Sequence, residues 1–187
     1  MTFLATLWLP ILVSAVLVFI ASSVIHMAPL WHRNELGAPP DADRLQDALR
    51  PFGLQPGEYM VPRPKDMKDC NTPEFIEKLK RGPNLIMTVI ANGPMSMSRP
   101  LVQWFIFVLV VSVLTAYLAA ATLPADATYL AVFRVAGTTA FIAYAAGVWP
   151  QSIWYHRPWR TTLKFTLDGL IYGLLTGGAF GGLWHMG

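Results

Sequence analysis

The sequence predicts an all-α membrane protein: a four-transmembrane-helix bundle with a small cytoplasmic α+β insertion between spans 1 and 2. Three observations support this fold class. The 187-residue chain is 54% hydrophobic and only 13% charged, whereas a soluble domain is usually about a quarter charged. Four long apolar stretches are separated by polar connections. Nearly all charged residues gather in two of those connections, residues 33–99 and 157–164.

Each apolar stretch is long enough to cross about 30 Å of hydrocarbon at about 1.5 Å per residue. The expected domains are residues 1–28, which hold the first span, a cytoplasmic lobe over residues 29–100, and residues 101–187, with spans over 101–123, 129–149 and 165–184. Pro10 is expected to kink the first span without preventing it. We expect that span to be retained, because it lacks a basic leader and exceeds the length of a signal-peptide core.

The distribution of Lys and Arg predicts the orientation. The 123–128 connection has neither residue, so it is expected outside. Basic residues flank the lobe and fill the 150–164 connection: Arg33, Arg99, Arg157, Arg160 and Lys164. Positive-inside bias then makes residues 29–100 cytoplasmic and places the N and C termini outside. With no N-glycosylation acceptor in this small chain, we expect a bacterial inner (plasma) membrane protein.

The lobe is expected to hold two short helices and two short strands. "PPDADRLQDALRPFG" reads as a helix capped by Asp41 or Asp43, and "TPEFIEKLKRGP" as one that starts at Thr72 with Pro73 in its first position. "EYMV" and "NLIMTVIAN" are rich in strand-forming residues. A two-stranded ribbon of this kind is marginal by itself, so we expect the lobe to lean on the bilayer or on the spans.

Glycines recur every four residues along the fourth apolar stretch: Gly169, Gly173, Gly177 and Gly181. Residues at this spacing share one helix face. Small residues let helices approach closely in lipid, so this stripe predicts a helix–helix seam. The third stretch offers a matching Gly/Ala surface. The seam lies either inside one chain or between two chains of a homo-oligomer.

Asp168 is the one carboxylate in the fourth apolar stretch. A local explanation places it in the first turns of its helix, favoured by the helix dipole and by Lys164. Arg134 is expected about 17 Å away along the membrane normal, too far for a direct bond. The functional alternative is an Asp168-centred polar cluster at one depth, which suits a proton relay, a cation site or an acid–base pair. Its expected members are His26, Gln103, Tyr144, Asp168 and Tyr172.

A second constellation lies at the predicted inner interface. Its members are His32, Arg33, His156, Arg157 and Arg160. They are either candidate ligands for an anionic head group or topology determinants beside interfacial tryptophans.

No metal site and no cofactor are predicted. The single Cys70 excludes a Cys-based metal site or disulfide framework. Haem ligation would need two histidines at one depth, and Pro29 is expected to separate His26 from His32. None of the common catalytic motifs occurs, so enzyme status and catalytic residues stay open.

Three functions remain. The first is a structural or regulatory protein that packs with itself or with a membrane complex through the Gly/Ala seam. The second is a small transporter or channel that uses the Asp168-centred polar cluster. The third is a membrane enzyme acting on a lipid head group or quinone at the cytoplasmic interface. The bilayer is a certain neighbour on this fold, whereas the charge pattern excludes nucleic acid as a partner.

Overall fold

This computed structural model describes residues 2–27, 32–33 and 35–185. The chain divides into two compact units: Met1–Glu35 with Ser96–Gly187, and Leu36–Met95. Helices make up 69% of the structure and a small sheet of two strands is present, so the mainly helical prediction is confirmed.

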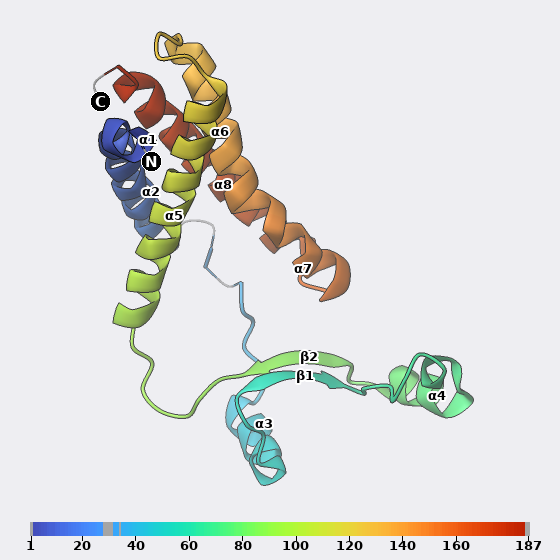
Figure 1. The fold of residues 1–187 in the computed structure, drawn as a ribbon. Coiled ribbons are helices and arrows are strands. Elements are labelled where there is room, and N and C mark those ends of the chain that lie inside the picture. Colours follow the sequence, from blue (N-terminus) through green and yellow to red (C-terminus); the bar gives the residue numbers. More distant parts are fainter. Residues whose placement is uncertain (1, 28–31, 34, 186–187) are drawn as a thin grey trace. The chain divides into compact units, whose positions relative to one another are not determined.

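The larger unit is a helical bundle (Figure 1). Its elements in chain order are α1 (Thr2–Thr6), α2 (Trp8–Met27), α5 (Ser98–Thr122), α6 (Tyr129–Ala145), the short 3-10 turn η3 (Ala146–Val148), α7 (Trp149–Trp154) and α8 (Trp159–Leu183). Three stretches are long and apolar enough to cross a membrane: Trp8–Met27, Ser98–Thr122 and Tyr129–Trp154. These stretches indicate a membrane protein.

Helix α8 differs from the predicted fourth span. It has 25 residues, the same length as α5. However, it begins at Trp159 instead of residue 165, so it also contains Arg160 and Lys164. With Asp168 and its glycines, these residues make α8 less apolar, and it is not among the three candidate spans found in the described helices. The fourth span therefore stays a prediction.

The first apolar stretch bends at Leu7, close to Pro10. Helix α1 ends at Thr6 and α2 begins at Trp8. A proline ring clashes with the carbonyl of the residue four positions earlier, which here is Thr6. Pro10 itself lies in the first turn of α2, where its missing N–H removes no intrahelical hydrogen bond.

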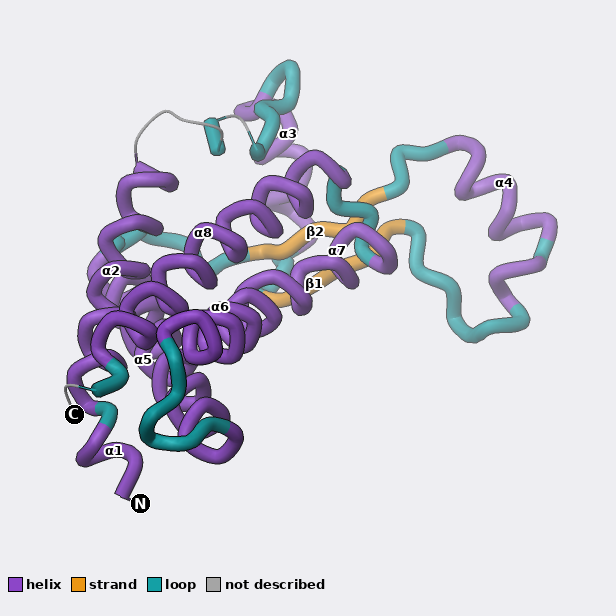
Figure 2. The backbone as a smooth tube through the Cα atoms, turned by 90° about the horizontal axis from the view of Figure 1, so that it is seen from above, coloured by secondary structure: helices purple, strands orange, loops and turns teal. Residues whose placement is uncertain are grey.

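Helices α6 and α8 lie side by side and touch through their backbones (Figures 1 and 2). A Cβ added at Gly173 would lie 2.9 Å from the carbonyl oxygen of Gly137, and one at Gly177 would lie 2.9 Å from that of Phe133. The two outer glycines approach α6 as closely: Gly169 lies against Ala145, and Gly181 against Tyr129. All four glycines of the stripe thus face α6 of the same chain.

The interior of the bundle contains two buried apolar clusters. The plug cluster, defined by its buried members, comprises Leu7, Ile11, Ala116, Ala119, Ala127, Val132, Ala136, Phe180 and Trp184. The second cluster comprises Ala15, Val18, Ile25, Val108, Val111, Ala140, Tyr144 and Tyr172. Along α8, Tyr172 and Phe180 are eight residues apart, which is about 12 Å at the helical rise. The plug cluster therefore lies toward the C-terminal end of α8.

The smaller unit is a β-ribbon with two helices. Its elements in chain order are α3 (Ala42–Leu49), η1 (Arg50–Phe52), β1 (Gly57–Val61), η2 (Asp69–Asn71), α4 (Pro73–Arg81) and β2 (Leu85–Val89). The strands pair antiparallel, with Tyr59 opposite Met87. Asp41 caps α3 by accepting from the N–H of Arg44, and Thr72 caps α4. Among residues 36–95, all of them described, only Phe75 is buried, so this unit has almost no core of its own.

Candidate functional site

A buried carboxylate on α8 pairs with a histidine that follows α2. Asp168 is 1% exposed, and its Oδ2 lies 2.7 Å from Nε2 of His32. The other ring nitrogen of His32, Nδ1, lies 2.8 Å from Oε1 of Glu35. One imidazole therefore bridges two carboxyl groups, one at each ring nitrogen. Such pairing is what the burial of a charge requires.

His26 supplies a second imidazole to the same place. Its ring stacks on that of His32, with centroids 4.3 Å apart and planes inclined by 10°. Nδ1 of His26 lies 3.0 Å from the carbonyl oxygen of Ser22, one turn earlier on α2. Because a carbonyl only accepts hydrogen bonds, Nδ1 is the donor in this contact, and Nε2 takes no part in it.

We refer to His26, His32 and Asp168 together as the cation cluster. One potential ligand atom from each residue lies within 4.8 Å of the other two. A tetrahedral Zn²⁺ with bonds of about 2.0–2.2 Å holds its ligand atoms about 3.4 Å apart. Metal binding therefore requires His26 to tilt out of its stack and the pair of His32 and Asp168 to open by less than about 1 Å. Two imidazoles and a carboxylate suit a first-row divalent cation and leave one coordination position open.

The cation cluster has the outer hydrogen bonds that metal-ligating histidines usually have. A ligating histidine normally donates its second N–H to a carboxylate or a backbone carbonyl. Glu35 offers that carboxylate to Nδ1 of His32, and the Ser22 carbonyl accepts from Nδ1 of His26. Neither contact uses an Nε2 atom; that of His32 faces Asp168 and would have to turn from its carboxylate to an ion. The Ser22 hydroxyl accepts a hydrogen bond of 2.7 Å from the indole of Trp104, which ties this turn of α2 to α5.

Arg157 lies beside the cation cluster on its polar side. Its Nη2 is 3.9 Å from Oε2 of Glu35, and its guanidinium carbon lies 4.8 Å from the centre of the Phe165 ring. The Phe165 ring in turn meets the edge of His32, with centroids 5.1 Å apart. Glu35 therefore faces both a histidine and an arginine, which orient its carboxylate.

Several buried hydroxyl groups lie in the interior of the bundle beyond Asp168. Four of them have no hydrogen-bond partner within the part of the chain that the structure describes: Thr115, Tyr144, Tyr172 and Thr176. Asp168, Tyr172 and Thr176 follow one another at four-residue intervals, so they share one face of α8 at steps of about 6 Å. The hydroxyls of Ser14 and Ser112 are also buried and lie 3.1 Å apart. Unpaired buried polar groups are uncommon and call for an explanation.

The predicted polar cluster is only partly assembled. Tyr144 and Tyr172 pack edge to face, with ring centroids 5.3 Å apart, and His26 and Asp168 both belong to the cation cluster. Gln103 is exposed on α5 and takes no part. Its neighbour Trp104 occupies the inward direction, because one position along a helix changes the facing direction by about 100°.

The predicted anion-binding set does not converge. His32 belongs to the cation cluster, and Arg157 turns to Glu35 and Phe165. Three members are exposed: Arg33, His156 and Arg160. The described side chains of this set thus form no single anion pocket.

Two expectations about depth were wrong. Pro29 was expected to separate His26 from His32, but the two rings stack with centroids 4.3 Å apart. Asp168 was expected in the first turns of its helix. Because α8 starts at Trp159, Asp168 is its tenth residue, beyond the turn in which the helix dipole acts. Its pairing with His32 is a contact that the structure shows.

Glu35 was missed from sequence. The segment "HRNE" places a carboxylate three residues after His32, and this spacing was the available signal.

The chain matches no protein-family model, no curated protein and no solved structure. The geometry of the cation cluster and of the buried hydroxyls beside it on α8 is thus the guide to function.

Proposed function

We propose that this protein is a small divalent-cation transporter of the bacterial inner membrane, with the cation cluster as its cytoplasmic binding site. The observation that carries the proposal is the bridging of two carboxylates by His32, beside a second histidine whose Nε2 is available as a ligand. Ionisable groups within or beside membrane spans commonly mark substrate and ion pathways.

The proposal includes four spans, with α8 as the fourth. Its 25 residues measure about 37 Å at the helical rise, enough to cross the bilayer. Its polar face is directed inward, since Asp168 and Thr176 are buried in the bundle, while Leu167, Leu170 and Leu174 are exposed to the surroundings. Positive-inside bias then puts residues 29–100 in the cytoplasm and both termini outside.

The buried hydroxyls supply the proposed route for the cation. A hydroxyl left without a partner in a dry interior costs about 1–3 kcal/mol, so four such groups in one bundle support a polar route. Hydroxyl oxygens can replace water around a moving cation or hold the waters that accompany it. Beyond Thr176, the plug cluster with Phe180 and Trp184 closes the route. We propose that helix movements open this end when the cytoplasmic end closes.

Packing against a second copy or a membrane complex is a second candidate, with less support. The stripe from Gly169 to Gly181 is occupied by α6 of the same chain. Gly178 and Gly182 have nothing within 4 Å of an added Cβ, and they leave a small-residue surface for another helix. The size of the detergent-solubilised protein and its co-purifying partners would test this candidate.

Transport is tested in proteoliposomes that contain a zinc-sensitive fluorophore. With a Zn²⁺ gradient across the membrane, the wild-type protein should produce an internal fluorescence rise at least about tenfold faster than Asp168→Asn, because loss of a charge-bearing ligand weakens the site. Asp126→Asn is the matched control, since Asp126 is exposed in the 123–128 connection. A wild-type rate equal to that of protein-free liposomes would refute transport.

A further inference from the structure

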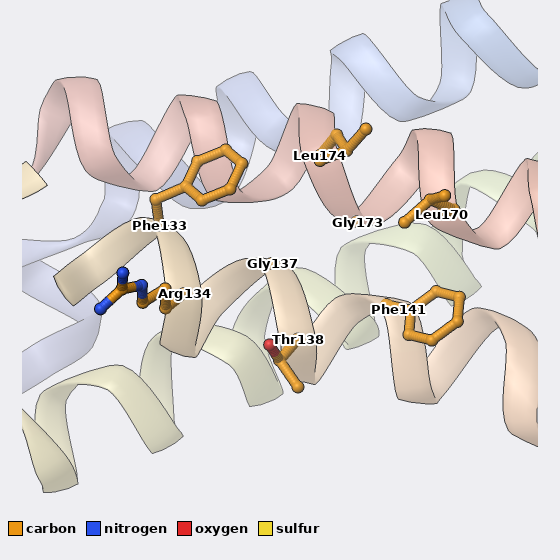
Figure 3. Close-up of a pocket in the computed structure, with 8 residues that line it drawn as sticks. All are labelled: Phe133, Arg134, Gly137, Thr138, Phe141, Leu170, Gly173 and Leu174. Atoms are coloured by element: carbon orange, nitrogen blue, oxygen red, sulfur yellow. The ribbon is translucent and has the colours of Figure 1, made fainter. Parts of the chain in front are cut away.

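Away from the cation cluster, a groove runs between α6 and α8 on the outside of the bundle (Figure 3). The residues lining it are Phe133, Arg134, Gly137, Thr138, Phe141, Leu170, Gly173 and Leu174. Its floor is backbone, because Gly137 and Gly173 meet there without side chains. Phe133 and Phe141 on α6, and Leu170 and Leu174 on α8, form apolar walls on either side.

Arg134 is the one charged residue of the groove. It is the sixth residue of α6, so its Cα lies about 7.5 Å along the axis from the first residue of a candidate membrane span. The side chain is exposed, and within the described ranges no carboxylate forms an ion pair with it. An arginine at this depth is costly unless it reaches the interface or a counter-charge.

Figure 3 shows the guanidinium of Arg134 directed away from Thr138, toward the start of α6. That direction leads out of the hydrocarbon, as expected for a side chain that snorkels to the head-group region. The apolar part of the groove extends the other way. From Phe133 to Phe141 it covers eight residues, about 12 Å of helix.

We infer that this groove binds one phospholipid of the adjoining leaflet, with its phosphate on Arg134 and an acyl chain between α6 and α8. The guanidinium supplies paired donors that match phosphate geometry. Thr138, one turn further on, offers a hydroxyl near the start of the chain region. The apolar walls and the glycine floor then accept the acyl chain. This inference does not depend on transport, because the groove and the cation cluster share no residue.

The test compares lipid retention in native mass spectrometry of the full-length protein. Purified protein is delipidated in detergent and supplied with phosphatidylglycerol or with diacylglycerol of the same chains. The wild type should retain phosphatidylglycerol about tenfold better than diacylglycerol, the size expected from a charge-assisted phosphate contact. Arg134→Gln should reduce this ratio to about one, whereas Arg134→Lys should keep most of it.

Arg160→Gln is the matched control, since Arg160 is an exposed arginine on α8 that does not line the groove. It should leave the retention ratio unchanged. Equal retention of the two lipids by the wild type, or an undiminished ratio in Arg134→Gln, would overturn the inference. Inorganic phosphate in place of lipid should not compete at millimolar concentration, because it lacks the acyl chain; competition at that concentration would also overturn it.

Discussion

His32 and Asp168 are 136 residues apart in the sequence, yet Nε2 of one lies 2.7 Å from Oδ2 of the other. The contact joins the segment after the first apolar helix to the last helix of the bundle. Glu35 and His26 complete its surroundings. The same four residues therefore link the fold to the proposed chemistry, and they can be tested separately.

Glu35→Gln should weaken zinc binding without abolishing it. Glu35 orients His32 from outside the ion, and loss of such an outer partner typically costs about 10–100-fold in metal affinity. The measurement is a competition titration with a zinc-sensitive dye. Glu58→Gln, on strand β1 of the smaller unit, is the control and should leave the affinity unchanged. Equal affinities of wild type and Glu35→Gln would remove Glu35 from the site.

Gly173→Ala should destabilise the bundle by about 1–3 kcal/mol, the usual cost of overpacking. The new Cβ would lie 2.9 Å from the carbonyl oxygen of Gly137 and 3.0 Å from Cβ of Phe141. Gly178→Ala introduces the same methyl group where nothing lies within 4 Å, so it should be neutral or slightly stabilising. Denaturation in mixed micelles, followed by circular dichroism, compares the two. Similar stabilities for both variants would show that α6 and α8 are not in backbone contact.

Tyr172→Phe should stabilise the fold while it slows transport. The Tyr172 hydroxyl is buried and has no partner in the described residues, so its removal relieves a cost of about 1–3 kcal/mol. The same removal takes away an oxygen next to Asp168 on the proposed route. Unfolding in mixed micelles and zinc flux in proteoliposomes measure the two effects. A loss of stability of similar size would mean that the hydroxyl is hydrogen-bonded and not part of a route.

Cys70 should react with a membrane-impermeant maleimide only from the cytoplasmic side. It is the single cysteine and is partly exposed in the smaller unit, so no substitution is needed. Labelling is expected in inverted vesicles and not in intact spheroplasts. A C-terminal protease site should show the opposite pattern if α8 crosses the membrane. Cleavage of that site only in inverted vesicles would refute the fourth span.

The helical membrane fold and the short sheet could be predicted because they depend on local patterns. Apolar stretches set the positions of α2, α5 and α6, and the caps at Asp41 and Thr72 follow directly from residue type. The start of α8 could not be predicted from hydropathy, because its first turns contain the polar residues Arg160 and Lys164.

The sequence predicted only two of the three members of the cation cluster to lie together, His26 and Asp168. Depth counting grouped His26 with Asp168, since both lie near the same predicted interface. His32 lies beyond Pro29 and was grouped instead with the interfacial Arg and His residues. Only the fold shows that His32 returns to Asp168 and stacks on His26. Gln103 was expected in the polar cluster but faces outward, whereas Trp104 faces inward and binds Ser22. Which side of a helix a residue faces does not follow from its depth in the membrane.

The proposed transport requires that His26, His32 and Asp168 bind one divalent cation. Isothermal titration of tag-free, detergent-solubilised protein with Zn²⁺ tests it most directly. We predict one Zn²⁺ per chain, an affinity reduced by more than about 100-fold in Asp168→Asn, beyond the effect of an outer partner, and an unchanged affinity in Asp126→Asn. Absence of binding to the wild-type chain, or equal affinities for wild type and Asp168→Asn, would contradict the claim.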